Sequence, residues 1–332
     1  MDNRERVIVA IQHKDTEKIP YNVDFTIEEA EKIIRYTKNP KFLETIGNHM
    51  DSVSCTAGFD IIKPGFVKDS FDVIWNRTVD RDIGIIDKIK IPVPDKKLIC
   101  LPEPDSDIVN RNITEMLKRK NNNFKIANIG FSLFERAWTL CGMENLLMWM
   151  VTDADFVHTL LDKICDYNLK IIEQAVKYPI DCFMFGDDWG QQKGLITGPG
   201  YWRKFILPRI KKMYDAVKKS GKFIAQHSCG DILEIFPDLI DAGLDIYQTF
   251  QPEIYDIKKV KKEYGANLTF WGGISTQAFL PFASPLEVKI KTREIMNILG
   301  KSGGYIAAPT HAMPKDIPEE NVIALIEVFQ NQ

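Results

Sequence analysis

Long apolar runs are absent from the sequence, and so is any excess of basic residues. A membrane-spanning helix needs about 20 consecutive apolar residues, and no segment approaches that length. Nucleic-acid binding needs a concentrated basic face, whereas this chain has 43 Lys and Arg against 46 Asp and Glu. The polar start, residues 1–15, does not resemble a secretory signal. We therefore expect a cytoplasmic protein that binds neither nucleic acid nor a membrane.

A disulfide framework is also absent. The six cysteines are scattered without close spacings, so reduced thiols are expected. Five of them are flanked largely by apolar residues and are predicted to act as small core side chains. Cys229 differs, because small and polar residues surround it in "HSCGD". This cysteine is therefore a candidate for chemistry.

The sequence lacks the glycine-rich turn that follows the first strand of an open dinucleotide-binding sheet. From about residue 125 onwards, short apolar strands instead alternate with segments of helical periodicity, three of which close on glycine. Because the strands are apolar almost throughout, this alternation predicts a parallel sheet covered by helices. The predicted strands are residues 125–130, 181–186, 222–226, 245–250, 267–273 and 304–309, and the predicted helical stretches are 200–221, 231–243 and 284–304.

Polar residues gather after nearly every predicted strand. Chemistry spread over the carboxyl ends of many strands is typical of a closed barrel. The sequence therefore predicts an α/β protein with a single (β/α)8 TIM-barrel domain, residues 1–332. Residues 1–124 are expected to supply an N-terminal helix, the first strand and covering loops, and residues 125–332 the main strands and helices.

Two of only five histidines follow predicted strand ends, and they suggest a metal site. His227 lies two residues from Cys229, and imidazole with thiolate suits Zn²⁺. A catalytic zinc needs a third protein ligand and an open position, for which His311 is the candidate. The alternatives are that His227 and Cys229 are core neighbours and that His311 packs in a proline-bracketed loop.

A second dense polar cluster is "GDDWGQQ", directly after an apolar strand. Asp187 is the candidate catalytic residue, either as an acid or base or as a group that orients a metal-bound imidazole. Asp188 and Trp189 are candidates for substrate binding. The alternatives are a helix cap for one aspartate, with the other solvated, and a core position for the tryptophan.

The remaining substrate-binding candidates lie elsewhere in the chain. Gln248 and Gln251 can hydrogen-bond a substrate without adding charge, and Asn22 and Asp24 follow an apolar step near the N-terminus. Loop packing is the alternative for the last two. Glu135 and Arg136 either pair with each other or face the mouth of the barrel.

Three segments, "HSCGDILEIFPDLIDAGLDIYQTFQP", "TFWGGIST" and "GGYIAAPTHAMPKDIPEENV", together resemble the uroporphyrinogen decarboxylase superfamily. The closer resemblance is to its methyltransferase branch, which includes methylcobamide:coenzyme M methyltransferases and corrinoid-dependent O-demethylase methyltransferases. It implies a (β/α)8 barrel, Zn²⁺, and a methylcorrinoid (cobalamin) carried by a separate partner protein. In that branch a His-x-Cys pair and a later cysteine hold the zinc. His227 and Cys229 match the pair, and His311 lies where the cysteine is expected.

This departure affects the expected substrate. Zinc with one thiolate and two imidazoles keeps a formal charge of +1, which suits polarising an oxygen leaving group. We expect a methyltransferase that moves a methyl group between a small methylated substrate, with a methyl ether favoured, and a corrinoid protein. One alternative is a metal-free decarboxylase, although residues 17–33 lack the arginines that such enzymes carry near the N-terminus. The other is a non-catalytic barrel that binds a corrinoid protein.

Overall fold

The computed structural model describes residues 1–79, 81–82 and 84–332, and its chain forms two compact units. Unit 1 comprises Met1–Asp51, Lys120–Lys125 and Asp245–Gln332, and unit 2 comprises Ser52–Arg119 and Ile126–Leu244. The division falls within strands β1 (Met50–Ser54) and β6 (Phe124–Ile129). Among the described residues, no helix combines the length and the apolar character that crossing a bilayer requires.

Three parallel strands form the centre of unit 2: β6, β7 (Cys182–Gly186) and β10 (Phe223–His227). Their apolar side chains are largely buried. In the β7–β10 pair, Phe223 lies opposite Cys182 and His227 lies opposite Gly186. Because the register is unbroken over five residues, the two strands end at the same level.

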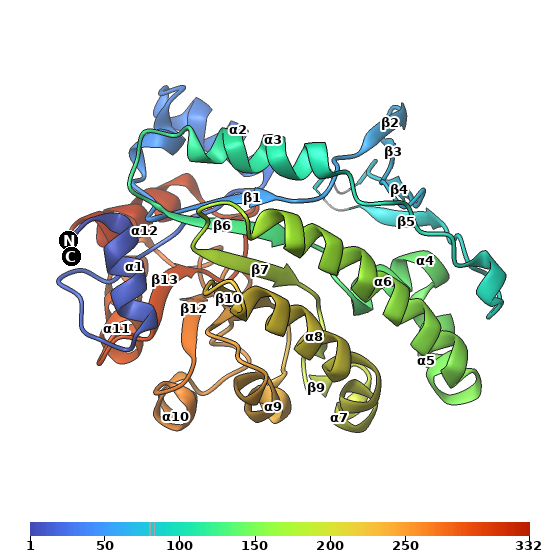
Figure 1. Cartoon of the computed structure of the whole chain (residues 1–332). Coiled ribbons are helices and arrows are strands. Elements are labelled where there is room, and N and C mark those ends of the chain that lie inside the picture. The colour runs from blue at the N-terminus through green and yellow to red at the C-terminus, as the bar shows by residue number, and fades with distance from the viewer. Residues whose placement is uncertain (80, 83) are drawn as a thin grey trace. The chain divides into compact units, whose positions relative to one another are not determined.

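Helices cover these strands, and α6 (Ala154–Ala175) and α8 (Leu207–Lys218) lie side by side in Figure 1. Arg209 on the second of them donates through Nε to Asp162 on the first, at 2.9 Å. A turn of π-helix, Trp202–Ile206, leads into that second helix. The helices of unit 2 are α3 (Ser106–Leu117), α4 (Phe134–Cys141), α5 (Met143–Thr152), α6 (Ala154–Ala175), α7 (Gly198–Tyr201), α8 (Leu207–Lys218) and α9 (Phe236–Asp241).

Unit 2 also contains a small antiparallel sheet in the order β2-β3-β4-β5, which the sequence did not predict. Its strands have only three or four residues, and the edge strand β2 is exposed along its whole length, so no alternating pattern marks them. A separate two-stranded hairpin, β8–β9, follows β7 in the chain. The strands are β2 (Asp60–Lys63), β3 (Phe66–Lys68), β4 (Ile74–Asn76), β5 (Ile85–Lys88), β8 (Gly190–Gln191) and β9 (Gly194–Leu195).

Unit 1 is built around three further parallel strands in the order β11-β12-β13. The N-terminal segment joins them through a parallel bridge between Tyr21 and Ala307. The elements of unit 1 are α1 (Asn3–Ile11), α2 (Ile27–Thr37), β11 (Ile246–Phe250), α10 (Ile257–Tyr264), β12 (Thr269–Ile274), α11 (Pro285–Leu299), β13 (Tyr305–Pro309) and α12 (Glu319–Gln330).

All six predicted strands are confirmed to within two residues at their ends, and each predicted helical stretch contains a helix. The predicted parallel pairing is confirmed inside each unit. The protein is therefore an α/β protein in which helices follow parallel strands. Closure into an eight-stranded barrel, and a single domain over residues 1–332, stay predictions.

Candidate metal centre

The register of β7 and β10 brings two sequence-distant polar segments together. Gly186 ends β7 opposite His227, which ends β10. One residue further on, the backbone N–H of Asp187 donates to the carbonyl of His227 at 3.1 Å. Parallel strands that end at one level place the residues after them at one edge of the sheet. Asp187 and Asp188 therefore emerge directly beside His227 and Cys229.

Two glycines let the loops after these strands approach each other more closely than other residues would. A Cβ on Gly190 would lie 2.6 Å from the carbonyl oxygen of Cys229, and a Cβ on Gly230 would lie 2.3 Å from the carbonyl carbon of Gly190. Gly230 also has a φ of +78°, which favours glycine. The N–H of Asp231 then donates to the carbonyl of Gln191 at 2.8 Å. This close approach holds the loop after β7 against the loop after β10.

The cluster itself consists of Asp188, His227 and Cys229, whose ligand atoms all lie within 4.8 Å of one another. Nε2 of His227 lies 3.4 Å from Oδ1 of Asp188 and 3.6 Å from Sγ of Cys229. The backbone N–H of Cys229 donates to Oδ1 of Asp188 at 2.8 Å. All three residues are partly buried. A carboxylate, an imidazole and a thiol therefore share one small space.

This arrangement fits a tetrahedral zinc ion. Zinc binds nitrogen and oxygen at about 2.0–2.2 Å and thiolate sulfur at about 2.3 Å, so its tetrahedral ligands lie roughly 3.4–3.6 Å from one another. The separations of Nε2 of His227 from the oxygen of Asp188 and the sulfur of Cys229 are 3.4 and 3.6 Å. Three protein ligands would leave a fourth position open, as in catalytic zinc sites.

The electrostatics of the cluster favour a bound cation. Burial lowers the pKa of His227, but hydrogen bonds to Asp188 and Cys229 outweigh it and hold that pKa well above its usual value. Burial raises the pKa of Asp188, but the hydrogen bond to His227 and the charge of His227 outweigh this effect. The pKa of Asp188 is therefore lowered from its usual value. Glu135 is close enough for burial and the charges of Asp188 and Asp187 to raise its pKa strongly. The carboxyl groups of Asp188 and Glu135 thus both interact electrostatically with His227, and a divalent cation would relieve the repulsion between these two carboxyl groups.

Asp187 is fully buried and faces the start of α4. Its two oxygens accept the backbone N–H groups of Leu133, Phe134 and Glu135 at 3.2, 2.9 and 2.8 Å. They also accept the indole N–H of Trp189 at 2.6 Å. Burial raises the pKa of Asp187 to about 6, and these four donors oppose the increase. Asp187 therefore ties the first turn of α4, and Glu135 with it, to the end of β7.

Glu135 and Arg136 do not pair with each other. Arg136 is buried, and its NH1 lies 2.6 Å from Oδ2 of Asp69, which directly follows β3. The guanidinium also lies over the ring of Phe71, 4.1 Å from its centroid. Asp69 accepts the N–H of Phe71 as well, at 2.9 Å. The side chain of Glu135 instead lies close enough to Asp187 and Asp188 for their charges to raise its pKa.

Sequence reasoning gave Glu135 little weight and placed Asp188 among the substrate-binding residues. The adjacent aspartates after an apolar strand were the available signal, but the sequence does not reveal which of the two carboxylates lies beside His227. Trp189, a candidate substrate wall, is fully buried, and its ring packs against Trp202 at 5.3 Å between centroids. Its backbone N–H donates to Ser228 at 3.0 Å.

The other predicted site residues belong to unit 1. His311 is exposed and lies two residues after the end of β13. Gln248 is part of β11 and Gln251 directly follows this strand, where its carbonyl accepts the N–H groups of two later residues. Asn22 donates to Oδ2 of Asp24 at 2.8 Å. These residues are expected to contribute ligands and substrate contacts, and that expectation stays a prediction.

Known proteins resemble this chain in sequence and in fold. It is 24% identical over 248 residues to a uroporphyrinogen decarboxylase from Magnetococcus marinus, covering 70% of this chain and 65% of that protein. It is 23% identical over 182 residues to a methylated-thiol–coenzyme M methyltransferase from Methanosarcina mazei, covering 55% of this chain and 47% of that one. The matches thus span between about half and two thirds of these curated relatives.

A solved structure, described as a methyltransferase from Methanosarcina mazei, has the same fold with a TM-score of 0.73. It is 17% identical in sequence, and the match covers 100% of this chain and 99% of that one. The family model for uroporphyrinogen decarboxylase (URO-D) matches residues 86–332. The relatives named above, a decarboxylase and two methyltransferases, are all enzymes. The chain belongs to the uroporphyrinogen decarboxylase family, as the resemblance of its C-terminal segments predicted.

Proposed function

We propose that this protein is a zinc-dependent methyltransferase that moves a methyl group between a small methylated substrate and a corrinoid held by a separate protein. The observation that carries the proposal is the pair of distances from Nε2 of His227, 3.4 Å to Asp188 and 3.6 Å to Cys229, which match two edges of a tetrahedral zinc site. The methyltransferases among the sequence and fold relatives support the reaction class. We further propose that the parallel strands close into a (β/α)8 barrel, as the residue pattern suggests.

We propose His227 and Cys229 as two of the zinc ligands. The third is either Asp188, which the geometry favours, or His311, which the sequence favours. The choice of third ligand affects the expected substrate, because it sets the formal charge of the site. With one carboxylate, one thiolate and one imidazole the zinc site is neutral. With His311 in place of Asp188 it carries a charge of +1. The neutral site suits holding a thiol or thioether, and the charged site suits polarising the oxygen of a methyl ether.

Bound zinc would supply Lewis acidity, and the corrinoid of the partner would supply the strong nucleophile that no side chain offers. The residues of this chain position the groups around the proposed zinc site. Asp187 holds the first turn of α4 through three N–H groups, and so fixes the carboxyl group of Glu135 beside the cluster. Of the two roles expected for Asp187, acid–base catalysis or orientation, its complete burial favours orientation.

Substrate contacts from Asn22, Asp24, Asp188, Trp189, Gln248 and Gln251 remain part of the proposal. Neutral amides such as those of Gln248 and Gln251 would bind an uncharged methyl donor without adding charge. The metal-free decarboxylase is the rival within the family. A porphyrinogen with many carboxylates would need several free arginines, yet residues 17–33 contain none, and Arg136 is already paired with Asp69.

The proposal is tested first by metal analysis of the purified protein and of a His227→Ala variant, with Cys100→Ser as the matched control. Cys100 is exposed in unit 2 and lies outside the cluster. We expect about one zinc per chain in the wild type and the control, and a large loss in His227→Ala. Wild-type protein without zinc, or a His227→Ala variant that keeps it, contradicts the assignment.

The reaction is then tested with free reduced cobalamin in place of the corrinoid protein. Methyl ethers and methylated thiols are offered as donors, and the cobalamin spectrum reports transfer. Zinc-dependent transfer from either class supports the proposal. Carbon dioxide release from uroporphyrinogen by the metal-free protein would instead establish the decarboxylase.

A further inference from the structure

Phe131 has a backbone conformation that large side chains rarely adopt. Its φ of +49° lies in the left-handed region, which favours glycine and is strained for an aromatic residue. Strained backbone of this kind persists only where the surrounding structure fixes it, and it concentrates at functional sites. The contacts of Phe131 therefore show what this conformation positions.

Phe131 lies at the same edge of the sheet of unit 2 as the proposed zinc site. It comes two residues after β6 ends, and the next residue, Ser132, donates its N–H to the carbonyl of Gly186 at 2.8 Å. The N–H of Leu133 then donates to Asp187 at 3.2 Å. The segment that begins with Phe131 thus runs along the end of β7, directly before the aspartates of the polar cluster.

The ring of Phe131 packs on aromatic and cationic neighbours that do not cover it completely. The ring centroid of Trp75 lies 5.4 Å away, and that of Trp138, edge-on, lies 6.4 Å away. The guanidinium of Arg136 lies over the ring, 5.8 Å from its centroid. Phe131 and Trp138 nevertheless stay partly exposed. The uncovered part of the Phe131 ring can therefore contact a bound molecule.

These neighbours determine which molecule the ring favours. Arg136 already places one cation over the ring of Phe131, so a positively charged ligand there would be repelled. A carboxylate would find no free guanidinium, because Arg136 is paired with Asp69. A neutral aromatic ring has neither disadvantage, since aromatic pairs attract each other in offset or edge-on arrangements. An electron-donating substituent on that ring would also complement the electron density that the guanidinium draws from Phe131.

We propose that Phe131 is a specificity-determining residue, which selects methyl donors whose methylated oxygen or sulfur is attached to an aromatic ring. This inference rests on the proposed methyltransferase function and narrows its substrate class. The ring of the donor would lie against Phe131, and the methylated atom would face Asp188, His227 and Cys229.

An aromatic donor also suits the chemistry of transfer. The bond between the methyl carbon and the oxygen or sulfur breaks, and its electron pair stays on that atom. The methyl group forms its new bond with the electron pair of the reduced corrinoid. The leaving aryl oxide or aryl thiolate shares its charge with the ring and then takes a proton from water. It needs less stabilisation by the metal than an alkoxide does, so this donor fits either choice of third zinc ligand.

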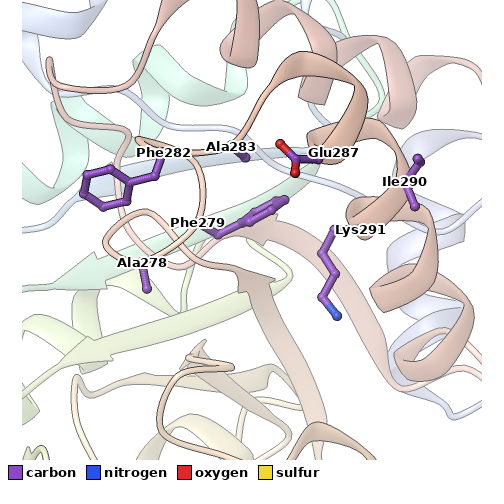
Figure 2. A pocket seen from close by; sticks show the side chains of 7 residues that line it. All are labelled: Ala278, Phe279, Phe282, Ala283, Glu287, Ile290 and Lys291. Atoms are coloured by element: carbon purple, nitrogen blue, oxygen red, sulfur yellow. The ribbon is translucent and has the colours of Figure 1, made fainter.

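A second group of exposed aromatic side chains provides the control. Phe279 and Phe282 line a hollow of about 410 Å³ beside α11 in unit 1, and Figure 2 shows both rings. None of the residues that line this hollow is a candidate site residue. Phe282 is 80% exposed, so Phe282→Leu removes a ring at little risk to folding.

The first test is a calorimetric titration of the full-length protein with methoxybenzene. Phe131→Leu removes the ring but keeps an apolar side chain, whereas Phe131→Tyr keeps the ring. We expect binding to weaken about two- to tenfold in Phe131→Leu, the range for loss of one aromatic pair, and to stay normal in Phe131→Tyr and Phe282→Leu. Equal binding by Phe131→Leu and wild type overturns the proposal. A wild type that does not bind methoxybenzene, or a loss of binding in Phe282→Leu, overturns it as well.

The second test compares methoxybenzene with 2-methoxyethanol as donors to free reduced cobalamin. Phe131→Leu should raise KM for methoxybenzene with little change in kcat, because the lost contact is present before and during transfer. The values for 2-methoxyethanol should not change. Equal effects on both donors would show a merely structural role and overturn the proposal.

The outcomes also separate this inference from the proposed function. Zinc-dependent transfer from 2-methoxyethanol but not from methoxybenzene overturns the role of Phe131 and leaves the methyltransferase function intact. A wild type without zinc that transfers a methyl group from neither donor overturns the proposed function, and the role of Phe131 with it.

Discussion

The backbone N–H of Cys229 donates to the carboxylate of Asp188 at 2.8 Å, across 41 residues of sequence. This bond joins the loop after β7 to the loop after β10. It holds Asp188 where its oxygen also lies 3.4 Å from His227. The bond thus sets the spacing on which the proposed zinc site depends, and Asp188 becomes the residue whose replacement is most informative.

Replacing Asp188 by Ala should lower the affinity for zinc more than replacing His311 by Ala. Loss of one ligand of a three-ligand site is expected to weaken binding by at least the 10–100-fold found even for residues outside the ligand set. Competition with a chromophoric zinc chelator would measure both variants. If His311→Ala loses zinc and Asp188→Ala keeps it, the ligand set predicted from the sequence holds, and with it the preference for a methyl ether.

Replacing Gly230 by Ala should destabilise the protein by about 2–4 kcal/mol and weaken zinc binding. The new Cβ would lie 2.3 Å from backbone of Gly190, and the φ of +78° adds strain of its own. Chemical denaturation and zinc titration would measure the two effects. Gly200→Ala is the control, because a Cβ there meets nothing within 4 Å. Unchanged stability of Gly230→Ala would contradict the close approach of the two loops.

Replacing Asp187 by Asn should cost about 3 kcal/mol of stability, because a buried amide cannot accept all four N–H groups and its own NH₂ would face some of them. Zinc should still bind, more weakly, since Asp187 is not a ligand in the proposed site. Thermal denaturation with zinc titration would separate these outcomes. Asp215→Asn, an exposed aspartate on α8, serves as control. A variant of full stability but no activity would favour the acid–base role instead.

Breaking the buried pair of Arg136 and Asp69 should cost about 3–5 kcal/mol, because the remaining charge would lie buried without its partner. Asp69→Asn and Arg136→Met would each be measured by chemical denaturation, and the double variant should recover part of the loss. Strictly additive losses would show that the two side chains do not interact.

Acid should destabilise the protein through His49. Burial, reinforced by the charges of Arg6 and Lys18, lowers the pKa of this histidine to about 4. The folded state thus binds its proton less readily than the unfolded state, whose histidine titrates near 6.5. The contribution is fully present above about pH 6.5 and is lost as the pH falls toward 4, up to about 3 kcal/mol.

The measurement is the free energy of unfolding between pH 4 and 7 for the wild type and His49→Asn. The asparagine can still accept the N–H of Tyr21, which lies 3.3 Å from Nδ1 of His49. We expect the stability of the wild type relative to His49→Asn to fall as the pH is lowered, since only the wild type carries the histidine. A difference that is constant with pH would contradict the lowered pKa.

The sequence by itself determined the elements that carry the fold. Runs such as residues 182–186 and 223–227 are apolar because parallel strands are covered on both faces, so they were found to within two residues. The sequence also indicated His227 and Cys229 as candidate metal ligands, because they follow a strand end at a spacing of two residues. The strands of residues 60–88 were missed because they are short and exposed, and leave no periodic signal.

Only the tertiary structure decided between the two adjacent aspartates. Neighbouring residues after a strand point in different directions, and which one turns toward β10 depends on the register of that strand and on two glycines that let the loops meet. Asp187 is consequently enclosed by N–H groups of α4, while Asp188 lies beside His227. Arg136 likewise pairs with Asp69, and Glu135 lies near Asp187 and Asp188 instead of pairing with Arg136. Both arrangements depend on contacts between segments that are distant in the sequence, so local sequence does not predict them.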